Sequence, residues 1–193
     1  MKTIFEMLAA YNRWANERLY DAAAVLSDSD YRADYGAFFG SLHATLNHIL
    51  IGDRIWMHVF TGEGEKPMQL DAILYDDIGQ LRAARRAEDA RIVSYVGSLT
   101  EQDLAGLVRY RTIRKPAEIE QHLAPLLVHF FNHQTHHRGQ AHCILTKVTG
   151  EAPSLDLVMF QRETGIGLTK GQGQGGMLSE PERRAAGAAM SSS

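Results

Sequence analysis

The chain has 193 residues, of which 45% are hydrophobic and 22% are charged, a composition typical of a soluble globular protein. Its single cysteine excludes a disulfide scaffold, and its formal net charge of −3 argues against nucleic-acid binding, which usually requires a basic surface. No apolar run approaches the roughly 18 residues of a membrane span, and the N-terminal segment lacks the uninterrupted apolar stretch of a signal peptide. We therefore expect a cytoplasmic protein without a membrane or nucleic-acid partner.

Apolar residues at three- and four-residue steps predict a long helix over residues 3–26. Residues 27–40, rich in Asp, Ser and Gly, favour a loop, and a second helix is predicted over about residues 40–60. The sequence TGEGEKP (residues 61–67) ends that helix, because it contains two glycines and a proline without helical periodicity. A third helix is predicted over about residues 70–97, and the many arginines and acidic residues in its middle indicate a solvated face with ion pairs.

The segment before the last helix is less regular. Thr100 and Asp103 have the spacing of a helix N-cap pair. The sequence LVRYRTI (residues 107–113) alternates as a short strand does, although one strand cannot form a sheet alone. A fourth helix is predicted over about residues 117–148, with Pro125 in its first turn or at a kink.

These four helices predict an all-α fold, a four-helix bundle that occupies residues 1–166. From residue 167 onward the composition changes, and Gly, Gln, Ser and Ala dominate. Such a composition cannot bury a core, so residues 167–193 are predicted to form a disordered low-complexity tail.

Histidines are concentrated in the sequence HFFNHQTHHRGQAH (residues 129–142). On a helix His133 and His137 lie one turn apart on the same face, a spacing that lets two imidazoles bind one divalent metal ion. His136 and His142 point about 100° or more away from His137, so neither joins the same site easily. A third ligand has to come from another helix. The second predicted helix offers His43, His48 and His58.

Among these three, His48 lies in the most apolar part of the helix, where an imidazole is costly to bury without a partner. A metal ion would supply that partner. His58 is better placed to cap carbonyl groups at the helix end, and His43 is expected to be structural or exposed. Spacing alone leaves open whether these histidines bind a metal, are buried against carbonyl groups or lie on a solvated face.

Two neighbours of the histidine pair are expected to lie outside the metal site. His129 shares the face of His133 but is a further turn away, which favours a position around the ligands or in the bundle interior. Cys143 is rotated by about 240° from His137, so we expect a small buried hydrophobic residue there rather than a ligand.

Three segments together resemble the DinB family: YNRWAN (residues 11–16), GSLHATLNHILIGDRIW (residues 40–56) and HFFNHQTHHRGQ (residues 129–140). This family is also grouped with YfiT-like metal-dependent hydrolases, and the resemblance covers roughly residues 1–165 in the right order and spacing. It implies a four-helix bundle of the DinB/YfiT type, commonly a homodimer, with a three-histidine metal site. Carried over to this chain, the family's metal ligands fall on His48, His133 and His137.

Three neutral imidazoles leave a divalent ion with its full charge and at least one open position, unlike the four protein ligands of closed structural zinc sites. Zinc and nickel both suit imidazole, and the sequence does not choose between them. At the open position the ion would either lower the pKa of a bound water to about 7 or hold a substrate thiol as the thiolate. The sequence identifies no general base and no other catalytic residue.

Relatives of the family include transferases that use mycothiol or bacillithiol. The resemblance therefore favours a metal-dependent thiol S-transferase in detoxification, which joins a low-molecular-weight thiol to an electrophilic small molecule. One alternative is a metal-dependent hydrolase that uses a metal-bound hydroxide. Another is a bundle that binds a metal or a small ligand without catalysis.

Several residues near the predicted ligands have competing interpretations. Gly52 would leave room beside the metal or allow close helix packing. For Asp53 and Arg54 we favour an ion pair or helix-end contacts, with a carboxylate that orients a ligand histidine as the alternative. Trp14 and Trp56 are expected in the core or a dimer interface rather than against substrate.

Two polar residues follow His137 closely. Arg138 is expected to have a solvated or interhelical role, with binding of an anionic substrate as the alternative. Gln140 lies three residues after His137, and its side chain is expected to reach the pocket.

Overall fold

The computed structural model describes residues 1–111 and 117–169. Its elements in chain order are α1 (Lys2–Ala23), α2 (Asp28–Arg32), α3 (Leu42–Thr61), α4 (Ile78–Ser98), α5 (Glu101–Ala105), β1 (Leu107–Arg111), β2 (Glu118–His122), α6 (Leu123–Thr149) and α7 (Leu157–Thr164). Met1–Leu155 form one compact unit, which holds every element except α7. The second unit begins at Asp156.

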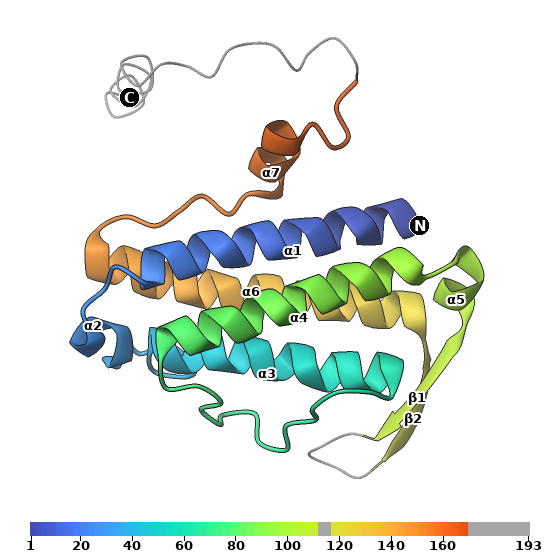
Figure 1. Ribbon diagram of the computed structural model, residues 1–193, viewed down its shortest axis with the longest axis horizontal. Helices are drawn as coiled ribbons and strands as arrows, with labels where there is room; N and C mark the ends of the chain where they lie inside the picture. The colour runs from blue at the N-terminus through green and yellow to red at the C-terminus, as the bar shows by residue number, and fades with distance from the viewer. Residues whose placement is uncertain (112–116, 170–193) are drawn as a thin grey trace. The chain divides into compact units, whose positions relative to one another are not determined.

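Four long helices, α1, α3, α4 and α6, form the bundle (Figure 1). α1 packs against α4 and α6, and α3 packs against the same two helices, so each long helix has two neighbours. The core between them contains two clusters of buried side chains, one around Met57 and Phe130 and the other around Tyr20 and Leu46. The all-α four-helix bundle predicted from helical periodicity is thus confirmed.

Polar caps and glycines set the ends of the helices. The Ser41 hydroxyl accepts a hydrogen bond from the Ala44 N–H at the start of α3, and the Asp77 carboxylate accepts one from the Gln80 N–H at the start of α4. Gly150 ends α6 with a φ of 79°, a left-handed conformation that residues with a Cβ rarely adopt. The predicted end of the fourth helix before Gly150 is confirmed.

The third helix starts later than its apolar pattern predicted, because Asp77 caps it and residues 62–77 form a loop. The buried Asn47 of α3 holds this loop: its Oδ1 accepts hydrogen bonds from the N–H groups of Leu74 and Tyr75, at 2.9 and 3.0 Å. Both of those side chains pack on the core from the loop. These apolar residues of the loop therefore extended the apolar pattern from which the third helix was predicted.

The fourth helix also starts later than predicted, at Leu123, with Pro125 in its first turn. The residues just before it form β2, which pairs with β1 in an antiparallel hairpin from Leu107↔His122 to Arg111↔Glu118. The short strand predicted over residues 107–113 is therefore confirmed for Leu107–Arg111. Residues 112 and 113 lie outside the described part of the chain.

Two short helices complete the comparison with the predicted elements. Thr100 and Asp103 form a reciprocal capping box that begins α5, as their spacing predicted. α2 lies inside the segment that was predicted to be a loop throughout. From residue 170 onward, the predicted disordered tail lies outside the residues that the structure describes.

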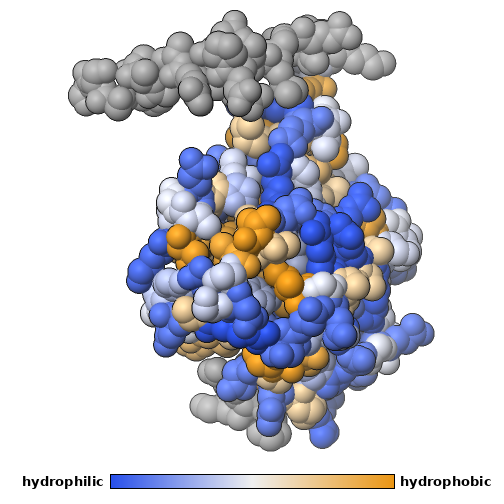
Figure 2. All heavy atoms as spheres, turned by 60° about the vertical axis from the view of Figure 1, so that its left-hand side comes forward, coloured by the Kyte–Doolittle hydropathy of each residue, from blue (hydrophilic) through white to orange (hydrophobic). Residues whose placement is uncertain are grey.

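On the face shown in Figure 2, the coloured residues are predominantly polar, with separate apolar patches between them. Large apolar side chains that are mostly exposed include Val25, Phe38 and Met68. No helix in the described ranges combines the length and the hydropathy that crossing a membrane requires.

Candidate metal centre

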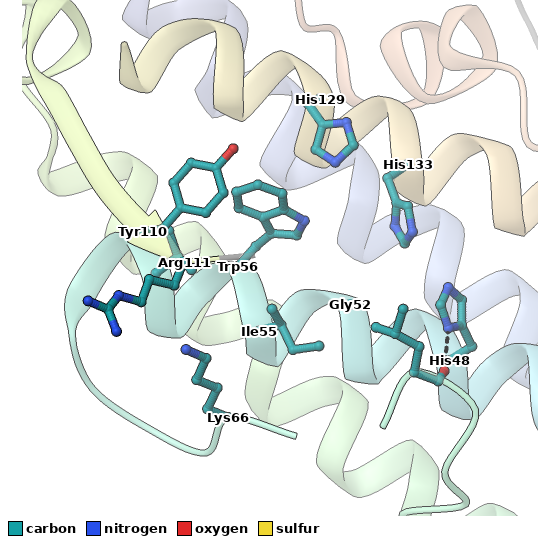
Figure 3. Close-up of a pocket in the computed structure, with 11 residues that line it drawn as sticks. His48, Gly52, Ile55, Trp56, Lys66, Tyr110, Arg111, His129 and His133 are labelled. Carbon is teal, nitrogen blue, oxygen red and sulfur yellow. Dashed lines mark hydrogen bonds between the residues drawn. The ribbon is translucent and has the colours of Figure 1, made fainter. Parts of the chain in front are cut away.

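Three histidines from two facing helices converge at the middle of the bundle. α3 supplies His48, and α6 supplies His133 and His137. The Nε2 atom of His137 lies 3.2 Å from that of His48 and 3.1 Å from that of His133. One ligand atom from each of the three residues lies within 4.8 Å of the others. Figure 3 shows the rings of His48 and His133 across the gap between α3 and α6.

In His48 and His137 the outer ring nitrogen, Nδ1, is hydrogen-bonded away from the triad, which leaves the inner nitrogen, Nε2, facing its centre. The Nδ1 of His48 is 2.7 Å from the carbonyl oxygen of Leu70, which can only accept, so Nδ1 carries the hydrogen. The Nδ1 of His137 is 2.8 Å from Oε1 of Gln140 and donates in the same way. In neutral His48 and His137 the inner Nε2 atoms therefore point lone pairs at each other.

The electrostatic surroundings keep these imidazoles neutral. Burial, together with the neighbouring imidazole of His137, lowers the pKa of His48 to about 4 and that of His133 to about 3. Burial lowers the pKa of His137 as well, although its hydrogen bond to Gln140 opposes the shift. Neutral imidazole is the form that binds metal ions, so these three histidines could hold one at neutral pH.

Two neighbours fix the position of the rings. The phenyl ring of Phe39 stacks on the His48 imidazole with a centroid distance of 3.9 Å and also lies 5.6 Å from that of His137. Gly52 leaves space for the ring of His133: a Cβ at Gly52 would lie 2.9 Å from its Cε1. The room expected at this glycine is thus taken up by the ring of His133.

A series of buried polar contacts begins at Asp53, the residue next to Gly52. Asp53 of α3 forms an ion pair of 2.5 Å with Arg85 of α4, and Arg85 also lies 3.1 Å from Asp89. All three side chains are almost fully buried. Burial raises the pKa of Asp53, and the charge of Arg85 opposes that shift. Asp53 is therefore an ion-pair partner, as favoured from the sequence.

The interhelical role expected for Arg138 is confirmed. This side chain is buried, and it donates a hydrogen bond to Oδ1 of Asn12 in α1. Asn12 in turn donates to a carboxylate oxygen of Asp89 at 3.1 Å. On the other side of the site, Arg54 forms an ion pair with Glu65 in the 62–77 loop.

Two cavities reach the triad, and His48, Leu70 and His133 line both of them. We call the first the apolar cavity; it has a volume of about 330 Å³ and extends along the C-terminal half of α3, where Ile55, Trp56 and Val59 line it. Figure 3 shows its lining.

We call the second the polar cavity. It has a volume of about 610 Å³, and its other lining residues are Phe38, Phe39, Met68, Asp71, His136, His137 and Gln140. Gln140 reaches it, as predicted. The two cavities extend from the same histidines in different directions along α3 and α6.

The other histidines take the following positions. His43 is buried with its Nε2 3.1 Å from the Tyr75 carbonyl oxygen, and His58 places Nδ1 3.1 Å from the Gly64 carbonyl oxygen, so both bind carbonyl groups. His136 stays outside the cluster, as its direction on the helix predicted. His129 is exposed on the wall of the apolar cavity rather than in the bundle interior.

The expectation for Cys143 was wrong, because its thiol is exposed rather than buried. It lines a surface pocket with Tyr35 and Lys147, outside the triad. Trp56 is half-buried: it packs against the core and also forms a wall of the apolar cavity, so the contrast between core and substrate contact drawn from the sequence does not hold for it.

Comparison with known proteins agrees with this architecture. A sequence model of the DinB family matches residues 1–174, which is most of the chain. The chain belongs to the DinB family. It is also 25% identical over 167 residues to Protein DinB of Bacillus subtilis (strain 168), an alignment that covers 81% of this chain and 94% of that protein.

The features that sequence reasoning missed in this DinB-family chain are contacts from loops. Phe39 and the carbonyl group of Leu70 orient His48 from segments before and after α3. Neither lies at a helical spacing from His48. For Phe39 the available signal was its closeness to His48 in the sequence. The carbonyl group of Leu70 gave no signal, because every residue has a backbone carbonyl.

Proposed function

We propose that the protein is a metal-dependent enzyme that holds one divalent ion, zinc or nickel, through His48, His133 and His137. We further propose that it transfers a low-molecular-weight thiol to an electrophilic small molecule, as a detoxifying thiol S-transferase. The observation that carries the metal proposal is the pair of inner nitrogens of His48 and His137, whose lone pairs face each other at 3.2 Å.

Two facing lone pairs repel unless a proton or a metal ion lies between them. The lowered pKa of both histidines disfavours the proton. Two imidazole nitrogens bound to one tetrahedral zinc ion, with the usual bonds of about 2.0–2.1 Å, stand about 3.3 Å apart. The separations of 3.2 and 3.1 Å in the triad fit that requirement.

The chain's own residues supply orientation. Leu70 and Gln140 accept hydrogen bonds from the outer nitrogens of His48 and His137, which fixes the tautomers and directs the inner nitrogens to the centre. Three protein ligands leave a divalent ion at least one position, at which it would stabilise a substrate thiol as the thiolate.

The two cavities favour transfer between two organic molecules over hydrolysis. A hydrolase needs room for one organic substrate and a water molecule. Here both the apolar and the polar cavity have the size of small-molecule sites, and both are lined by His48 and His133. One cavity can hold the thiol while the other holds the electrophile.

The first experiment is elemental analysis of the protein purified without a histidine tag, together with His48→Ala, His133→Ala and His137→Ala. His142→Ala is the matched control, because His142 lies on α6 but outside the triad and both cavities. We expect about one ion per chain in the wild type and the control, and loss of the ion in each folded triad variant. Metal retained in the triad variants would refute the site.

The second experiment tests the reaction. The metal-loaded protein is incubated with glutathione, bacillithiol or mycothiol and a panel of electrophiles, and conjugates are measured by mass spectrometry. Conjugation that His133→Ala abolishes and His142→Ala leaves intact supports the transferase. If no conjugate forms and the protein instead hydrolyses esters or amides in a way that depends on the triad, the transferase proposal fails and the hydrolase takes its place.

The homodimer and the cytoplasmic location remain predictions from the sequence. The mass of the protein in solution, measured by light scattering at micromolar concentration, tests the first of them. A monomer mass would contradict it.

A further inference from the structure

The apolar cavity has a chemical gradient along its length. At one end lie His48 and His133, and its walls are the side chains of Ile55, Trp56 and Val59. Trp56 is held in place by ring contacts with Tyr110 and with His129, at centroid distances of 5.4 and 5.1 Å. A rigid aromatic and aliphatic wall of this kind favours a ligand with an apolar body.

The end of the cavity away from the histidines is cationic. Figure 3 shows Lys66, from the 62–77 loop, and Arg111, at the end of β1, on the side of the cavity opposite His48 and His133. Lys66 has no ion-pair partner among the residues that the structure describes. Within residues 1–111 and 117–169, the one ion-pair contact of Arg111 is a long one of 3.9 Å with the exposed carboxylate of Glu118.

The acidic residue next to Lys66 does not neutralise this end. Glu65 is already paired with Arg54, whose guanidinium also donates to the Tyr75 hydroxyl at 3.0 Å. The two cations that line the cavity are therefore available to an anionic group at this end.

We propose that the apolar cavity binds a small organic acid: an apolar body lies along Trp56, Ile55 and Val59, its carboxylate lies at Lys66 and Arg111, and its other end faces the histidines. The role of this ligand as the electrophilic substrate rests on the proposed function. The class of ligand rests only on the lining of the cavity. A volume of about 330 Å³ lies at the small end of the range for ligand sites and fits a small molecule rather than a polymer.

The test compares octanoate with 1-octanol, which share an apolar chain and differ in charge. Both are titrated by calorimetry into the full chain, with and without zinc. The variants are Lys66→Gln, which removes one cation, and Val59→Phe, which fills the apolar wall. Lys147→Gln is the matched control, because it removes the same charge at a different surface pocket.

We expect octanoate to bind more tightly than 1-octanol. Lys66→Gln should weaken octanoate by up to about fivefold, the range for an exposed ion pair, and leave 1-octanol unchanged. Val59→Phe should weaken both ligands, and Lys147→Gln neither. Equal affinities for the two ligands, or an equal effect of the two lysine variants, would overturn the proposal.

The zinc arm separates this inference from the proposed function. With its carboxylate at the cationic end, octanoate should bind with similar affinity in the presence and absence of zinc. A large gain in affinity with zinc that survives in Lys66→Gln would place the carboxylate on the ion and overturn the proposed orientation. If no zinc binds at all but octanoate still depends on Lys66, the proposed function fails while the ligand class stands.

Discussion

Gly52→Ala separates folding from the proposed metal binding, because the added methyl group should leave the stability of the fold nearly unchanged while it displaces the ring of His133. Gly52 lies within α3, where alanine is a better helix former. Its new Cβ would lie 2.9 Å from Cε1 and 3.4 Å from Nδ1 of His133, closer than unstrained packing allows. The side chain of His133 rotates more easily than the backbone moves, so the ring should leave its position opposite His48.

The expected magnitudes follow from these contacts. Replacing a helical glycine by alanine stabilises the fold by about 1 kcal/mol, and turning one side chain away from its preferred rotamer costs about 0.5–1.5 kcal/mol. The free energy of unfolding of the metal-free protein should therefore stay within about 1 kcal/mol of the wild type. Metal affinity should fall by about 10–100-fold, as it does when a ligand loses its orientation.

The assays are urea unfolding of the metal-free protein and zinc titration against a competing chelator. Gly139→Ala is the matched control: it is also helical, it lies on α6 close to two of the ligands, and its added Cβ meets no atom within 4 Å. We expect the control to gain stability and to bind zinc as the wild type does. Wild-type zinc affinity in Gly52→Ala would refute the assigned role of the close approach to His133.

Four further predictions follow from the triad and from the buried polar contacts around it. Zinc binding at pH 6 should release fewer protons than the roughly two that three ordinary histidines would release, because the folded-state pKa of each triad histidine is lowered. Calorimetry in two buffers of different ionisation enthalpy measures this number. By the same shifts the unfolded chain binds protons that the folded chain rejects, so the free energy of unfolding should fall as the pH is lowered below about 6.5. Arg85→Met removes the buried ion-pair partner of Asp53 and Asp89 and should cost about 3–5 kcal/mol in urea unfolding. Arg86→Met breaks an exposed pair and should cost less than about 1 kcal/mol. Asn47→Ala removes the acceptor for the N–H groups of Leu74 and Tyr75, so proteolysis in residues 62–77 should become faster and zinc affinity weaker; unchanged values of both would contradict the role of this loop.

Helical periodicity predicted the bundle because each long helix buries one face, and burial leaves a repeat that can be read from residue types. The same repeat misplaced the start of the third helix, where apolar residues such as Leu74 reach the core from a loop. The polar sequence of β2 also misled, since its residues pair through the backbone with β1 and alternate only between half-buried and exposed positions.

For the candidate metal centre, too, residue patterns predicted one part of the arrangement and not the other. The spacing of His133 and His137 on one helix specified their common face, and the apolar surroundings of His48 singled it out among the histidines of α3. Their convergence depends on how α3 packs against α6, which no local pattern encodes. The resemblance to the DinB family joined the three residues, and the distances between their nitrogens agree with that assignment.

The position of α3 relative to α6 is held by polar contacts as well as by the apolar core. From Asp53, next to Gly52, ion pairs and hydrogen bonds run through Arg85, Asp89 and Asn12 to Arg138, the residue that follows His137. This path contacts all four long helices, and each of its side chains is buried. Apolar side chains tolerate small shifts between helices, whereas a shift here would leave buried charges without partners at a cost of several kcal/mol. The contacts that fix the helices therefore begin and end beside the residues of the triad, so the triad can keep its geometry without a bound ion.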